Sequence, residues 1–234
     1  MQDKELKHEF ELERVILFSD AVFAIIITIM VLDIKLPEGL RHAKADVVAH
    51  AFLELTPKFI AYMVSFFLVS MFWVRHLKIF KTLRDYDVAL VARNLVFLFI
   101  ISLFPFAVSI ISGTLSPSNY WSFDVYITII LAGTFTQTVI VQYIVKHKQR
   151  LCFSPEAVED TLKWKVHKLN FIVIPIALVV LVVMNFSGLV QWAPYVIVMQ
   201  AIVLKRQQNK YYPKKPLLNK HPVKVENEEV SLQN

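Results

Sequence analysis

The sequence predicts an all-α integral membrane protein with six transmembrane helices per chain. Of its 234 residues, 56% are hydrophobic. These residues come in blocks near or above the length that spans a bilayer, without the amphipathic alternation of a soluble domain. Lysine and arginine gather in alternate loops, as a membrane topology requires. Because that pattern accounts for the net charge of +6, we expect the lipid bilayer, and no nucleic acid, as a partner.

Six apolar blocks predict the spans, at about residues 14–35, 50–74, 89–112, 121–146, 168–186 and 189–205. Pro57 falls inside the second block, so that helix is expected to kink there or to begin there. The last two spans are separated only by a tight turn at Ser187 and Gly188. They are therefore expected to form an antiparallel hairpin.

The two ends of the chain differ in character. Residues 1–206 form the predicted six-helix membrane domain. Residues 207–234 contain Pro213, Pro216 and Pro222 and end in an acidic patch. This composition predicts a disordered tail.

The distribution of positive charge predicts the orientation. Most lysines and arginines lie before the first span, after the second, after the fourth and in the tail, whereas the opposite side has only Lys35, Arg41 and Lys44. The positive-inside rule therefore places both termini in the cytoplasm. An even number of spans independently requires the termini to share a side.

The first span contains a carboxylate, Asp20. A charge at mid-membrane costs about 2.5–3.5 kcal/mol on insertion scales, so it needs partners or a position near a helix end. Asp20, His76 and Asn94 all lie about 9 Å or less from the cytoplasmic ends of their spans. They predict a polar network that joins the first three helices through Arg14, Ser19, Asp20, Trp73, His76 and Asn94. A snorkelling Asp20 and an interfacial aromatic anchor at Trp73 are the alternatives.

A second feature of the first span is a stripe formed by Ile25, Thr28, Ile29 and Leu32. These residues recur at i, i+3, i+4 and i+7 and therefore share one helix face. Asp20 is rotated from Ile25 by about 140°. If Asp20 faces protein, the stripe faces lipid, another helix or a subunit axis.

Three separated motifs carry a family resemblance. They are Arg14-x-x-x-Phe18-Ser19-Asp20, then Phe72-Trp73-x-x-His76, then Arg93-Asn94-Leu95. In this order they resemble the lysosomal potassium channel family, transmembrane protein 175. The chain has one six-helix unit, as in the bacterial branch of that family.

The resemblance implies a potassium-preferring cation channel in the bacterial plasma membrane, assembled as a homotetramer with the first helix lining the pore. It places the apolar constriction at Ile25, with Ile29 and Leu32 along the same stripe and a hydroxyl layer at Thr28. Arg14 and the Phe18-Ser19-Asp20 motif would hold the helices together. No cofactor is expected beyond the permeant potassium ion. The carbonyl-lined T-V-G-Y-G filter loop of other potassium channels does not occur in this sequence.

Other functions remain open at this point. Asp20 and His76 could relay protons in a proton channel or proton-coupled transporter, since histidine titrates near neutrality. A purely structural scaffold is a further possibility. We expect no enzyme, because the other histidines are scattered among loops, helix ends and tails. The single cysteine, Cys152, provides neither a disulfide nor a metal-ligand spacing, so no metal site is predicted.

Overall fold

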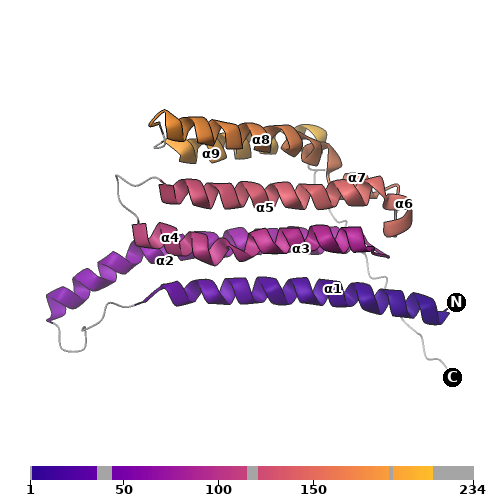
Figure 1. Ribbon diagram of the computed structural model, residues 1–234, viewed down its shortest axis with the longest axis horizontal. Helices are drawn as coiled ribbons and strands as arrows, with labels where there is room; N and C mark the ends of the chain where they lie inside the picture. The colour runs from indigo at the N-terminus through magenta and orange to yellow at the C-terminus, as the bar shows by residue number, and fades with distance from the viewer. Residues whose placement is uncertain (1, 36–43, 115–120, 190–191, 213–234) are drawn as a thin grey trace, which may run out of the picture.

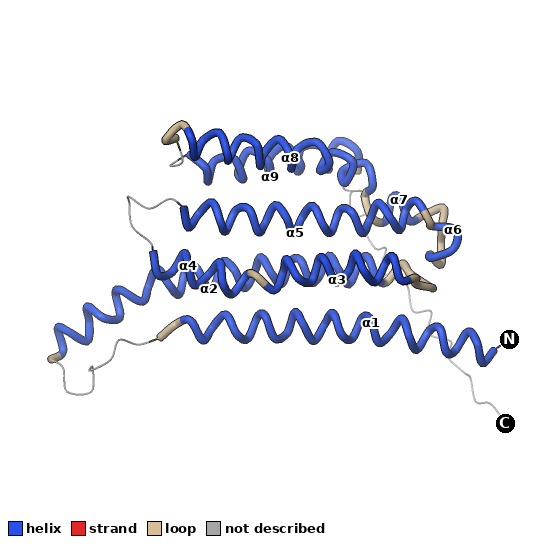
Figure 2. The backbone as a smooth tube through the Cα atoms, viewed as in Figure 1, coloured by secondary structure: helices blue, strands red, loops and turns tan. Residues whose placement is uncertain are grey.

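The computed structural model describes residues 2–35, 44–114, 121–189 and 192–212. Figure 2 shows helices and loops, with no strand in these parts of the chain. The elements are α1 (Gln2–Ile29), η1 (Met30–Asp33), α2 (Ala45–Phe80), α3 (Val88–Ser102), α4 (Phe104–Thr114), α5 (Trp121–Lys146), α6 (Lys148–Leu151), α7 (Val158–Thr161), α8 (Trp164–Phe186) and α9 (Ala193–Tyr211). The predicted all-helical class is confirmed for the described residues.

Four helical segments of the described chain are long and apolar enough to cross a membrane. They are Ala45–Phe80, Val88–Gly113, Ser122–Lys146 and Trp164–Phe186. They correspond to the second through fifth predicted spans, so the chain is a multi-pass membrane protein. The first and sixth predicted spans fall on α1 and α9, which each combine an apolar half with a charged half.

Several helix boundaries differ from the predicted ones. Helix α1 begins at Gln2 instead of residue 14 because the charged N-terminal residues are good helix formers and include no glycine or proline. Helix α9 continues to Tyr211, so the predicted tail is helical over its first five residues, 207–211. Residues 213–234 lie outside the described residues. Helix α2 runs unbroken through Pro57.

The predicted span 89–112 consists of two helices, α3 and α4, which meet at Leu103. Pro105 explains the break, since proline has no N–H to donate to the carbonyl of Ile101 and clashes with it. The chain tightens there, and Leu103 N donates to Ile100 O at 3.2 Å.

The helices form a slab of layers. Figure 1 shows α1 at one edge, then α2 to α4, then α5, with α8 and α9 at the other edge. The N-terminus, α6 and α7 lie at one end of the slab, here called the N-terminal end. The segment after α2 is hydrogen-bonded to the end of α6 and the residues that follow it. Arg84 N donates to Leu151 O at 2.8 Å, and Phe153 N donates to Thr82 O at 3.2 Å.

Aromatic side chains fill the centre of the slab between α1, α2, α3 and α4. Phe97 lies 6.0 Å from Phe23 and 6.2 Å from Phe72, measured between ring centroids. Helix α5 approaches this core closely at Gly133, where a Cβ atom would lie 3.2 Å from Ile101 and 3.3 Å from Phe72. A second, smaller core joins α5 to α8 through Ile127, Leu131, Ile174, Ala177 and Leu181.

Candidate functional site

The Asp20 carboxylate of α1 is hydrogen-bonded to a tryptophan of α2. Trp73 Nε1 donates to Asp20 Oδ1 at 2.9 Å across 53 residues of sequence. A charge-assisted bond of this kind is stronger than one between neutral groups. The contact gives Asp20 a protein partner and fixes the rotation of α1 against α2.

A chain of three polar side chains joins α1, α3 and α2 at the same level. Asn94 Nδ2 donates to Ser19 Oγ at 2.9 Å, and His76 Nε2 donates to Asn94 Oδ1 at 2.8 Å. Ser19 Oγ in turn donates to Val15 O at 2.9 Å. All three side chains are buried, so each of these hydrogen bonds offsets a desolvation cost.

His76 lies between aromatic rings. Its ring stacks on Phe80 at 4.2 Å and on Phe97 at 5.7 Å between centroids. Its Nδ1 atom has no hydrogen-bond partner among the described residues. This packing resembles that of a core side chain more than that of an exposed proton relay.

The other two residues of the first motif lie at the surface of the subunit. Phe18 is 53% exposed, and Arg14 is exposed. Both line a groove of about 440 Å³ together with Tyr86, Asn94 and Leu95. Seven residues were predicted to hold the helices together, six in the network and Phe18 in the motif. The structure brings five of them into two hydrogen-bonded groups and places Arg14 and Phe18 beside these groups.

The stripe on α1 faces away from the subunit. Ile25 is 56% exposed and Leu32 is 66% exposed, and Thr28 and Ile29 are exposed as well. The opposite face, with Phe23, Ile26 and Met30, is buried in the core. Thr28 Oγ1 donates to Ala24 O at 2.9 Å, so its lone pairs remain available on the exposed side.

Comparisons with known proteins find one family that matches part of this chain. Residues 14–105 match the model of the family described as endosomal/lysosomal potassium channel TMEM175. All eleven predicted site residues lie in that range. The predicted resemblance to the TMEM175 family is confirmed.

Similar proteins include a potassium channel from Chryseobacterium sp. (strain P1-3), 41% identical over 90 residues that cover 38% of this chain and 43% of the relative. A zebrafish (Danio rerio) protein named endosomal/lysosomal proton channel TMEM175 is 26% identical over 68% of this chain and 30% of its own length. The aligned part spans about half the length of the first curated relatives it matches, from 43% to 63%.

The fold also matches a solved structure. A potassium-selective TMEM175 homologue from Chamaesiphon minutus superposes with a TM-score of 0.64 and is 24% identical, over 85% of this chain and 98% of that one. The described helices therefore have the TMEM175 fold. The matched family is described as a potassium channel, which is not an enzyme class, and this is consistent with the expectation from the sequence.

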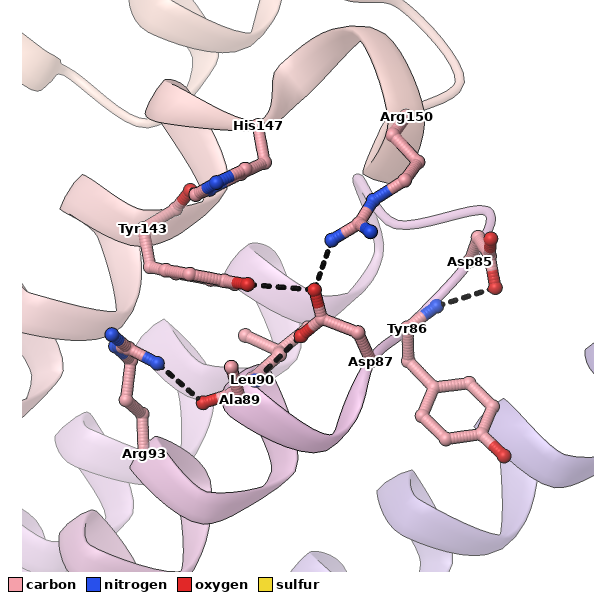
Figure 3. Close-up of polar contacts among 9 residues, drawn as sticks. All are labelled: Asp85, Tyr86, Asp87, Ala89, Leu90, Arg93, Tyr143, His147 and Arg150. Carbon is pink, nitrogen blue, oxygen red and sulfur yellow. Dashed lines mark hydrogen bonds and ion pairs between the residues drawn. The ribbon is translucent and has the colours of Figure 1, made fainter.

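A second polar cluster, at the N-terminal end, was missed by the sequence analysis. Figure 3 shows Asp87 at its centre. Its carboxylate accepts hydrogen bonds from Leu90 N at 2.7 Å and from Tyr143 Oη at 2.6 Å, and it pairs with Arg150. Asp87 lies inside the TMEM175-matched range, whereas Tyr143 and Arg150 lie outside it.

The cluster continues on both sides of Asp87. Arg93 lies over the Tyr143 ring, 4.0 Å from its centroid, and Tyr86 Oη donates to Glu11 Oε2 at 2.8 Å. The loop before α3 thus connects α1 to α5 and α6. An N-cap signal, an aspartate three residues before Leu90 at the start of an apolar block, could have identified Asp87, but no local signal points to Tyr143 or Arg150.

The cluster favours the ionised form of Asp87. Burial raises its pKa, but the hydrogen bonds from Tyr143 and Leu90 and the charge of Arg150 outweigh burial, and the pKa is lowered from its ordinary value. Asp87 is therefore a permanent negative charge at neutral pH that caps α3 and holds Arg150.

Proposed function

We propose that this chain is a subunit of a potassium-preferring cation channel whose pore is lined by α1. One observation carries the proposal: Ile25, Thr28, Ile29 and Leu32 are exposed, while the hydrogen bonds that Asp20 and Ser19 accept from Trp73 and Asn94 anchor the same helix to α2 and α3. An apolar stripe at a rigidly fixed rotation is what a narrow pore needs. The names of the bacterial relatives as potassium channels support the choice of ion.

The stripe would form its pore by meeting copies of itself. We propose a homotetramer in which four Ile25 side chains form a constriction, with rings of Ile29 and Leu32 and a hydroxyl layer of Thr28 beside it. A ring of apolar side chains excludes water and blocks ions until it widens. Selectivity then depends on the width of the apolar rings and on the Thr28 hydroxyls.

The proposed topology has six spans with both termini in the cytoplasm of a bacterial cell. The apolar part of the first span, residues 15–32, has 18 residues, or about 27 Å, which is close to the bilayer core of about 30 Å. The N-terminal end contains Lys81 and Arg84 after α2, and Lys148 and Arg150 in α6. This concentration of positive charge supports a cytoplasmic N-terminal end.

Ion flux in proteoliposomes tests the proposal. The wild-type protein should carry more potassium than sodium under opposed gradients, and Ile25→Asn should raise flux several-fold by hydrating the constriction. The matched control is Val179→Asn on α8, an equally exposed apolar position, which should leave flux unchanged. Equal effects of the two variants, or none at Ile25, would contradict the pore assignment.

The second candidate is a proton channel, and the name of the zebrafish relative favours it. Asp20 and His76 would be the proton carriers. However, Asp20 bonds to Trp73 and His76 bonds to Asn94, so the two groups belong to separate hydrogen-bonded pairs. A pH-sensitive dye inside the same liposomes separates the candidates: proton entry that is abolished by His76→Gln while potassium flux persists would favour the relay.

A further inference from the structure

A cavity of about 310 Å³ lies between α2, α5 and α9 and includes no residue of α1. Its lining changes in character along its length. Leu68 and Met71 of α2 and Ile130 and Leu131 of α5 make one part apolar, and Arg75 of α2 and Lys205 of α9 also line the cavity. The cavity is therefore amphipathic.

The two cations lie toward the same end of the slab. Helices α2 and α9 both run toward the N-terminal end (Figure 1). Arg75 lies five residues before the end of α2, and Lys205 lies six residues before the end of α9. Both charges are therefore within about 9 Å of their helix ends, at the depth where the headgroups of a bilayer would lie if this end is at the membrane surface.

Among the described residues, no carboxylate lines the cavity, and neither cation forms an ion pair. Two positive groups facing one space repel each other and attract an anion. Basic pockets between membrane helices are suited to anionic lipid headgroups. The charge arrangement thus selects an anion, and the apolar part of the cavity selects one that has a hydrocarbon chain.

Gln200 provides an independent observation. Its side chain lines the cavity and is only 9% exposed, and its Oε1 atom has no hydrogen-bond partner among the described residues. Such a buried, unsatisfied acceptor is costly unless an N–H or O–H group donates to it, which a water held between Gln200 and a ligand can do. Gln200 lies five residues before Lys205, about 7.5 Å deeper along α9, where the glycerol-ester region of a lipid lies relative to its phosphate.

We propose that this cavity binds one anionic phospholipid. Its phosphate lies between Arg75 and Lys205, and an acyl chain lies against Leu68 and Met71. A water donates one hydrogen bond to Gln200 Oε1 and another to an ester carbonyl of the lipid. The lipid connects α9 to α2 and α5, so it stabilises the outer layer of the slab. The site is independent of the proposed pore, and its test requires no ion flux.

Thermal unfolding and native mass spectrometry of the full chain in detergent test the site, with phosphatidylglycerol, phosphatidylcholine or inorganic phosphate added. Phosphatidylglycerol should raise the unfolding midpoint more than phosphatidylcholine and should remain bound at one copy per subunit. The double variant Arg75→Gln, Lys205→Gln should bind it about 30-fold more weakly, from the loss of two cations near a lipid phosphate. The control variant Lys81→Gln, Lys146→Gln loses the same charge from exposed positions outside the cavity and should bind normally.

The outcomes are distinguishable. Equal stabilisation by the two lipids, or equal loss in the two double variants, would overturn the site. Stabilisation by inorganic phosphate alone would show a free-anion site and also overturn the lipid proposal. If the Arg75 and Lys205 variant fails to fold, Ala201→Trp keeps both cations but fills the cavity from α9. It should abolish the retained lipid, and normal retention would refute the proposal.

Discussion

The slab exposes two apolar helix faces, one on α1 and one on α8, which differ in the hydrogen bonds that lie behind them. On α1 the exposed residues are Ile25, Thr28, Ile29 and Leu32, and on α8 they are Ile172, Ile176, Val179 and Val183. Behind the α1 face lie two hydrogen-bonded groups that reach α2 and α3. Behind the α8 face lies an aliphatic core with three described polar contacts, all of them to α5. Asn170 Nδ2 donates to Thr138 Oγ1 at 3.0 Å, His167 Nδ1 lies 3.2 Å from Thr138 Oγ1, and Asn185 Nδ2 donates to Asp124 Oδ2 at 2.6 Å.

Exposure therefore does not distinguish a proposed pore face from a lipid face. Lipid tolerates any rotation of an apolar helix, because all apolar side chains are equivalent to it. A pore requires one particular rotation, and directional hydrogen bonds to two different helices, as on α1, specify rotation better than hydrogen bonds to one helix, as on α8. The polar network behind α1 is what makes its stripe the better candidate.

The largest expected effect comes from removing the centre of that network. Asn94→Ala leaves His76 Nε2 buried without a partner, which costs about 1–3 kcal/mol, and releases Ser19. We expect a lower unfolding midpoint, loss of the assembled oligomer by gel filtration and altered ion flux in the protein that remains.

The comparison is Asn170→Ala behind the α8 face. Thr138 Oγ1 keeps its bond to Thr134 O at 2.8 Å in that variant, so the loss of stability should be smaller and the flux ratio unchanged. An Asn94→Ala protein with normal assembly and normal flux would show that the network does not orient α1.

A smaller effect is expected from lowering the pH, which acts on the Asp87 cluster at the N-terminal end of the slab. Because the pKa of Asp87 is lowered in the folded protein, its contribution to stability is complete above the ordinary carboxyl pKa of 3.8 and is lost as pH falls through the lowered value. The Asp87 contribution to the unfolding midpoint should therefore be flat from pH 8 to 5 and decline only below about pH 4. In Asp87→Asn this acid-dependent part should shrink; an identical pH profile in the variant would contradict the assignment.

The smallest effect is expected at Thr28. Thr28→Val removes a hydroxyl whose described bonds are local, to Ala24 O and Ile25 O, so stability should change by less than about 0.5 kcal/mol. The ratio of potassium to sodium flux should fall modestly because the hydroxyl layer is lost. Thr128→Val, an exposed threonine of α5, is the control. Equal ratios of potassium to sodium flux in wild type and Thr28→Val would show that the Thr28 hydroxyls do not contribute to selectivity.

Much of the candidate site could be predicted because its signals are local. The exposed stripe follows from the 3.6-residue period of one helix. The pairing of Ser19, Asp20, Trp73, His76 and Asn94 follows from depth, since polar groups at one membrane level must satisfy one another. The break at Leu103 also has a local cause, Pro105. The prediction missed it because the apolar block 89–112 continues through the break and indicated a single span.

The sequence by itself determined the helical class, four membrane spans, the polar residues at one level and the face of α1 that lacks polar anchors. Only the tertiary structure decided which groups touch: Tyr143 and Arg150 at Asp87, and Arg75, Lys205 and Gln200 around one cavity. The physical reason is distance along the chain. Helix periodicity and hydropathy act over one or two turns, whereas residues 56 to 130 apart in the sequence meet, or line one cavity, only through the way the packed helices dock.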